Sequence, residues 1–139
     1  MANRGMMKLL LDTNIFLEII LEQEKAQAAR DLLSRVGEHE YFVSDYSIHS
    51  IGLLLFRRER PDVFREFLVD MLHNVGVRLI ALSAEAMEDV LLPAQRFNLD
   101  FDDAYQYALA ECYGLALVSF DTDFDRTERG RKTPDQVLQ

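Results

Sequence analysis

Cysteine and histidine are scarce in this chain of 139 residues, which contains one cysteine and three histidines. Cys112 cannot form an internal disulfide, and without an export signal we expect a reducing, cytoplasmic location. Its surroundings, ALAECYGLALV, predict a buried thiol in a helix. Zinc sites need closely spaced Cys and His ligands, and the scattered His39, His49 and His73 do not supply that spacing.

Long apolar runs are also missing. No stretch approaches the roughly 20 apolar residues that span a bilayer, so we expect no membrane helix. The N-terminal run that ends at Asp12 lacks a small-residue cleavage site, and we interpret it as a first strand and not as a signal peptide. Residues 1–5 are expected to form a loose extension, since Met6 or Met7 is the more natural start.

Basic residues are outnumbered, because 15 Lys and Arg stand against 24 Asp and Glu and give a formal charge of −9. This charge argues against strong nonspecific binding of nucleic acid, which requires the neutralisation of phosphates. Two groups of basic residues leave two interpretations open, local basic patches or ordinary solvated faces. The groups are Arg57, Arg58, Arg60 and Arg65, and Arg126, Arg129, Arg131 and Lys132.

The composition, with 49% apolar and 28% charged residues, is typical of one globular domain, which we expect to span residues 1–139. Short apolar runs bounded by turn residues predict strands, and apolar residues at helical spacing predict helices between them. The predicted strands are residues 8–12, 41–45, 77–82 and 115–120. One predicted helix begins near residue 15, and another runs from residue 47 toward residue 61. The other predicted helices cover residues 24–36, 61–75, 84–97 and 104–113.

This alternation of strands and helices predicts an α/β domain with a mostly parallel central sheet of four or five strands. Residues 126–139 are expected to form a C-terminal tail or an edge element. In open sheets of this kind, ligands bind beyond the carboxyl ends of the strands. Asp12 follows the first predicted strand, and Asp121 and Asp123 follow the last. If these two strands are neighbours, their acids converge at one edge of the sheet.

A third group of acids, Asp102 and Asp103, precedes the predicted helix 104–113. Taken alone, each acid has an ordinary explanation as a helix cap or a solvated turn residue. One cap explains one aspartate and leaves its neighbour unexplained. Crowded carboxylates repel one another and resist ionisation unless a cation neutralises them. Oxygen ligands of this kind suit Mg²⁺ or Mn²⁺, so the acids together favour a divalent-cation site.

Three segments carry a family resemblance: LLLDTNIFLE, SDYSIHSIG and LDFDDAYQYALAECYGLALVSFDTDFD. They resemble the PIN-domain nuclease family, in particular its small single-domain VapC-like members, over almost the whole chain. The resemblance implies a three-layer α/β/α fold and a metal-dependent endoribonuclease. Asp12, Asp103 and Asp121 match the family's catalytic acids. Together with Asp123 they match its metal-coordinating residues, and Asn14 matches a supporting polar residue.

The sequence departs from the family in the helix after the second predicted strand. The family usually carries the pattern S-x-x-T-x-x-E, which Ser44, Ser47 and Ser50 fill here, so a serine stands where a glutamate is expected. Asp45 and Glu18 are candidates to compensate for it. The departure leaves an alternative open, in which the chain is a catalytically weakened PIN-like module that binds RNA or a protein.

The resemblance further implies an RNA substrate and one or two Mg²⁺ or Mn²⁺ ions. Arg126, just past the acidic loop, is the expected RNA-binding residue, while Tyr46 or Phe120 either stacks on a base or packs internally. Asp102 and Ser50 are expected to support the site. Toxin-type family members bind a cognate antitoxin and many form homodimers, so both kinds of partner are expected here, with no membrane contact.

Overall fold

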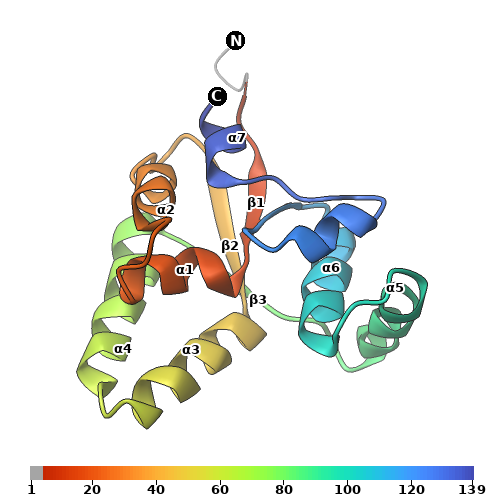
Figure 1. Ribbon diagram of the computed structural model, residues 1–139, viewed down its shortest axis with the longest axis horizontal. Helices are drawn as coiled ribbons and strands as arrows, with labels where there is room; N and C mark the ends of the chain where they lie inside the picture. The colour runs from red at the N-terminus through yellow and green to blue at the C-terminus, as the bar shows by residue number, and fades with distance from the viewer. Residues whose placement is uncertain (1–4) are drawn as a thin grey trace.

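The computed structural model describes residues 5–139 as one sheet with helices on both faces (Figure 1). All strand pairs are parallel, and the order is β3-β2-β1-β4, which confirms the predicted parallel sheet with four strands. The expected extension at residues 1–5 lies outside the described residues apart from Gly5. The strands are β1 (Lys8–Leu11), β2 (Glu40–Ser44), β3 (Arg78–Ile80) and β4 (Ala116–Val118).

The apolar strands bury side chains on both faces, as expected for a sheet that helices cover on each side. Leu9 and Leu11 of β1 point into one hydrophobic cluster, and Leu10 points into the other. All three leucines have no exposed surface. The central strands therefore fix two separate cores, and the outcome is the three-layer α/β/α arrangement that the resemblance implied.

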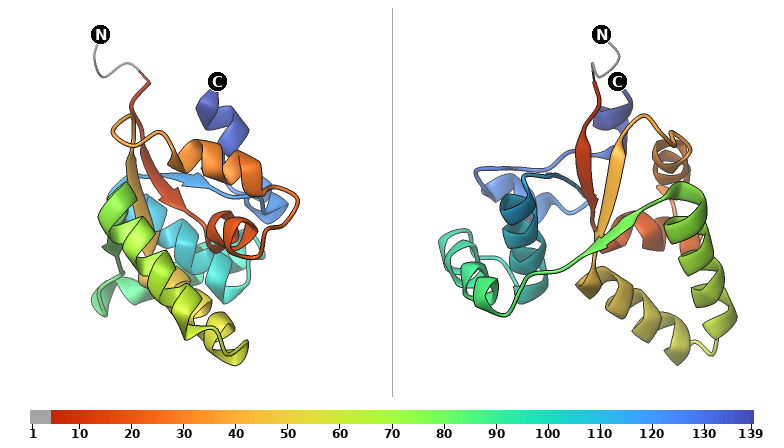
Figure 2. Two further views of the ribbon diagram at one scale, coloured as in Figure 1. Left: turned by 90° about the vertical axis from the view of Figure 1, so that its left-hand side faces the viewer. Right: turned by 180° about the vertical axis from the view of Figure 1, so that it is seen from behind.

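One set of helices covers the face that Leu9 and Leu11 share, and a second set covers the opposite face (Figures 1 and 2). The first set is α1 (Thr13–Ile20), α2 (Ala26–Leu33), α3 (Asp45–Arg57), α4 (Pro61–Leu68) and α7 (Pro134–Leu138). The second set is η2 (Glu85–Val90), α5 (Leu91–Arg96) and α6 (Phe101–Tyr113). Two further short helices are η1 (Val69–Val75) and η3 (Thr122–Arg126).

Three sequence expectations are corrected. The predicted helix 61–75 is α-helical only to Leu68 and continues as a π-helix, and the predicted helix 84–97 begins as a 3-10 helix before α5. Cys112 is exposed and not buried. The buried face of α6 ends at Ala110, and its last turn projects beyond the core, so an apolar neighbourhood in sequence did not produce burial there.

The C-terminal residues form both an edge element and a terminal helix. Lys132 N donates to Leu117 O at 2.8 Å, and Ser119 N donates to Lys132 O at 3.0 Å, so this segment pairs beside β4. Thr133 then caps α7 through a reciprocal capping box with Gln136. The outer edge of β4 is therefore occupied by the chain itself. None of the helices within residues 5–139 is long and apolar enough to cross a membrane.

Candidate metal centre

Asp12 lies directly after β1, where the chain turns into α1. Its N–H donates to Val118 O at 2.9 Å, and its Oδ1 accepts from Thr13 N at 2.8 Å and caps α1. The residue is only 6% exposed. Burial raises the pKa of this carboxyl, while hydrogen bonds from Ser119, Gln106 and Thr13 lower it. An ionised carboxylate at this depth depends on those donors.

Donors from three parts of the chain surround this carboxylate. Gln106 Nε2 donates to Asp12 Oδ1 at 2.9 Å, and Ser119 Oγ donates to Asp12 Oδ2 at 2.7 Å. Asn14 Nδ2 lies 3.5 Å from Asp12 Oδ2 and donates to Ser119 Oγ at 3.2 Å. The Asn14 Oδ1 accepts from Phe120 N at 3.2 Å. Asn14 thus joins the end of β1 to the loop after β4. Its role as the supporting polar residue that the resemblance implies stays a prediction.

Three further carboxylates converge beside this network. Asp103, Asp121 and Asp123 each offer one oxygen, and these oxygens lie within 4.8 Å of one another. Asp103 comes from the first turn of α6. Asp121 N donates to Ser119 Oγ at 2.9 Å, and Asp123 N donates to Asp121 Oδ1 at 2.8 Å. The loop after β4 therefore holds two acids opposite the one that α6 supplies.

The electrostatics of these three acids, which we call the acid cluster, are unfavourable without a cation. The pKa of Asp103 is raised to about 7, first by burial and then by the negative charges of Asp121, Asp102 and Asp12. Asp121 also raises the pKa of Asp12. Asp12 therefore lies within the electric field of the acid cluster, although it is not one of its three converging residues.

Asp102 faces a tyrosine and not the acid cluster. Tyr46 OH donates to Asp102 Oδ2 at 3.3 Å. Burial and then the charge of Asp102 raise the pKa of Tyr46, and a hydrogen bond with Ser50 lowers it. The negative charge of Asp12 contributes a smaller rise. Ser50, where the resemblance expects a glutamate, therefore stands beside the Tyr46 hydroxyl at the border of the acidic region.

The candidates to replace the missing glutamate have other partners. Asp45 Oδ1 accepts from Tyr105 OH at 2.7 Å, and Glu18 Oε1 accepts from Lys25 N at 2.6 Å. His49 lies on α3 among the residues of a separate apolar groove. Within the described part of the chain, none of these side chains joins the acid cluster.

Arg126 lies at the edge of the acid cluster and is engaged there. Its Nη1 donates to Asp123 Oδ1 at 3.0 Å, its Nε to Phe97 O at 3.0 Å and its Nη2 to Asn98 O at 2.7 Å. The guanidinium thus balances one acid and fastens the loop before α6 to the loop after β4. RNA contact by Arg126 stays a prediction, and it would require the exchange of at least one of these bonds.

Sequence reasoning did not identify Gln106, Ser119 and Ser47 as site residues. Gln106 is 1% exposed, and Ser119 and Ser47 are fully buried. The signal for Gln106 was present as one polar residue inside the apolar run Ala104–Ala110 of α6. A single sequence does not reveal which buried acceptor such a residue serves.

The donor set suits a hard divalent cation. Three carboxylates, one of them with a raised pKa, provide oxygen ligands and an excess of negative charge, and this combination suits a divalent cation that prefers oxygen. Among the described residues no Cys or His joins the acid cluster, so its chemistry does not suit zinc.

Known proteins with this sequence pattern and fold include ribonucleases and toxin components. The chain is 26% identical to Ribonuclease VapC42 of Mycobacterium tuberculosis over 132 residues, covering 86% of this chain and 95% of the relative. The fold is similar to a toxin–antitoxin complex from Klebsiella pneumoniae, with a TM-score of 0.70, 21% identity, and 91% and 97% of the two chains covered.

A second solved structure with the same fold is Mycobacterium tuberculosis VapC20, described as a toxin that cleaves the sarcin-ricin loop. It has a TM-score of 0.70 and 20% identity, and the match covers 84% of this chain and 92% of that one. At this identity the likeness concerns the fold alone. The family model described as PIN domain matches residues 9–130 of this chain. These residues include Asp12, β4 and every member of the acid cluster, and the chain belongs to the PIN domain family.

Proposed function

We propose that this PIN domain protein is a metal-dependent endoribonuclease and the toxin of a toxin–antitoxin pair. The observation that carries the proposal is the convergence of Asp103, Asp121 and Asp123, whose oxygens lie within 4.8 Å of one another. Its ribonuclease relatives and the toxin–antitoxin structures that share its fold support the same function. The substrate would be RNA, and the cation would be Mg²⁺ or Mn²⁺.

The acid cluster and Asp12 would hold the cation, with each residue contributing charge or orientation. A bound divalent cation would activate water for attack and neutralise charge on the phosphate. Ser119 accepts from Asp121 N and donates to Asp12, so it fixes both acids relative to each other. Arg126 holds Asp123 through its Nη1. These contacts restrict the acids before substrate arrives, and such preorganisation is the part of catalysis that the protein itself supplies.

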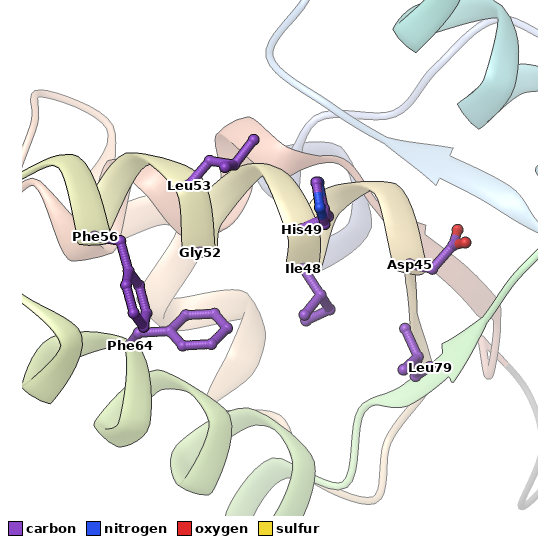
Figure 3. Close-up of a pocket in the computed structure, with 8 residues that line it drawn as sticks. All are labelled: Asp45, Ile48, His49, Gly52, Leu53, Phe56, Phe64 and Leu79. Atoms are coloured by element: carbon purple, nitrogen blue, oxygen red, sulfur yellow. The ribbon is translucent and has the colours of Figure 1, made fainter.

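An apolar groove lies apart from the acid cluster. The groove has a volume of about 480 Å³ and runs along α3, between α4 and β3 (Figure 3). Phe56, 60% exposed, and Leu53 and Leu79, 45% and 52% exposed, border it. The groove is lined by Asp45, Ile48, His49, Gly52, Leu53, Phe56, Phe64 and Leu79.

We assign this groove to a second copy of the chain. Phe56 is exposed at the border of this groove, so a twofold axis would bring each Phe56 against the other copy's groove. Strand β3 is the neighbouring sheet edge, and β2 is its one partner strand in the described sheet. The antitoxin would then bind elsewhere, and the net charge of −9 favours a partner with basic residues.

The second candidate function, a PIN-like module with little turnover, is favoured by Ser50. Its hydroxyl stands near Tyr46 at the border of the acidic region, where a glutamate would add a carboxylate. A weaker site would still bind a cation and RNA, and would act by holding RNA or a protein.

Replacement of Asp103 by Asn tests the cation site. We expect Asp103→Asn to lower Mn²⁺-dependent RNA cleavage by more than about 100-fold, since even residues behind a metal's direct ligands contribute about 10–100-fold. The fold should persist, because the substitution removes a repelled charge. Asp89→Asn, in η2 and outside the acid cluster, is the matched control. Equal cleavage by wild type and Asp103→Asn would rule out this centre.

The thermal stability of the metal-free protein should depend on pH through Asp103. Folding raises its pKa from 3.8 to about 7, so the folded state binds a proton more tightly than the unfolded state. Stability should therefore fall as pH rises between those two values, and less so in Asp103→Asn. Mn²⁺ at about 100 times its Kd should restore about 2.7 kcal/mol in wild type. Calorimetry of both proteins measures this, and parallel pH curves would contradict it.

Restoring the glutamate separates the two candidate functions. Ser50→Glu should raise Mn²⁺ affinity and cleavage roughly tenfold, equivalent to about 1.4 kcal/mol, if the natural site is a weakened nuclease. Ser50→Gln, which has the same length without the charge, is the control. RNA that stays intact with both wild type and Ser50→Glu, while still bound in a filter assay, would favour the binding module.

The self-association of the chain is tested at Phe56. A buried phenylalanine contributes about 1.5–3 kcal/mol, and an aspartate in its place would be buried as a charge. Sedimentation should therefore show a dimer for wild type and a monomer for Phe56→Asp. Val36→Asp, at a residue that is 56% exposed outside the groove, should remain dimeric. A monomeric wild type at high concentration would refute the dimer.

A further inference from the structure

Gln106 is a polar residue within a buried stretch of α6. Its neighbours from Ala104 to Ala110 on α6 are all buried, and Gln106 itself is 1% exposed. An amide in such a position costs free energy unless its polar atoms are paired. A leucine or methionine would fill the space without that cost, so packing alone does not explain the residue.

The amide nitrogen of Gln106 contacts the site through two short bonds. Nε2 donates to Asp12 Oδ1 at 2.9 Å and to Ser47 Oγ at 2.9 Å. Because a carboxylate oxygen only accepts, the nitrogen and not the oxygen of the amide must face Asp12. The side chain thus has one orientation, set by the acid that it contacts.

Ser47 extends this contact to the other helices. Its Oγ accepts from Ser44 Oγ at 3.2 Å and lies 2.7 Å from Thr13 Oγ1. Gln106 therefore joins α6 to the first turns of α1 and α3 at one point. It also lies three residues after Asp103, on the same helix. The Gln106 amide therefore connects Asp12 to the helix that carries Asp103.

The amide oxygen of Gln106 lowers the stability of the fold. Gln106 Oε1 is buried and has no hydrogen-bond partner. An unpaired buried acceptor destabilises the fold. Residues that lower stability in this way are found where function retains them.

We propose that Gln106 is a positioning residue, which holds the Asp12 carboxylate in the orientation that the cation site requires. This rests on the proposed function. Residues that hydrogen-bond to the acids of a metal site commonly change metal affinity by about 10–100-fold when they are removed. Gln106 acts through Asp12 and is assigned no contact with substrate.

The test compares Gln106→Met with wild type. Methionine has a similar volume and no amide. The change removes the unpaired Oε1 and also one of the close donors to Asp12. These two effects on stability oppose each other, so the metal-free protein should melt close to the wild-type temperature. Mn²⁺ Kd, measured by calorimetry, should rise about 10–100-fold, and kcat for RNA cleavage should fall with KM for RNA little changed. Gln95→Met, the same change at an exposed position on α5, should alter neither quantity.

Two further variants sharpen the result. Gln106→Asn keeps the amide on a shorter stem and should recover part of the Mn²⁺ affinity. Gln106→Glu keeps the shape, removes the donor and places a second acid against Asp12. This variant should therefore not recover the Mn²⁺ affinity. An unchanged Mn²⁺ Kd in Gln106→Met, or a loss that matches a drop in melting temperature, would overturn the positioning role. A wild type that binds no Mn²⁺ would instead overturn the proposed cation site, and this inference with it.

Discussion

The structure depends on keeping one buried carboxylate hydrogen-bonded. Asp12 is 6% exposed at the end of the central strand β1, where an unpaired charge would cost several kcal/mol, on the order of a small domain's whole stability. Thr13, Gln106 and Ser119 supply the close donors. Each comes from a different part of the chain, so satisfying Asp12 fixes α1, α6 and the loop after β4 around the end of one strand.

The same arrangement brings together acids that repel one another. Parallel strands place their carboxyl ends at one edge of the sheet, and β1 and β4 are direct neighbours there. The loop after β4 carries Asp121 and Asp123, and the first turn of α6 carries Asp103. The helix dipole of α6 favours an acid at that place, but the pKa of about 7 shows that it does not offset burial and the neighbouring charges. The repulsion among these acids lowers the stability of the metal-free protein, and a bound cation would offset that repulsion.

The parallel sheet was predictable from the sequence, because its strands leave local signals. The same signals mark the acids that follow the strands, whose role in a cation site stays a prediction. Continuous apolar runs ending in aspartate mark buried strands and the residues beyond them, as with LLLD at Asp12. The exposure of Cys112 was not predictable, since it depends on how far α6 extends past the core. The engagement of Arg126 was hidden for a similar reason, because two of its acceptors, at Phe97 and Asn98, precede it by almost thirty residues. The role of Gln106 depends on a contact across 94 residues.

Helix α3 contributes residues both to the hydrogen bonds around Asp12 and to the apolar groove. Ser47, in its first turn, contacts Gln106 and so belongs to the hydrogen bonds around Asp12. The next residue, Ile48, lines the apolar groove together with Gly52 and Phe56 (Figure 3). The groove and the hydrogen bonds around Asp12 therefore share one helix, with Ile48 on the groove side and Ser47 on the side of the buried carboxylate.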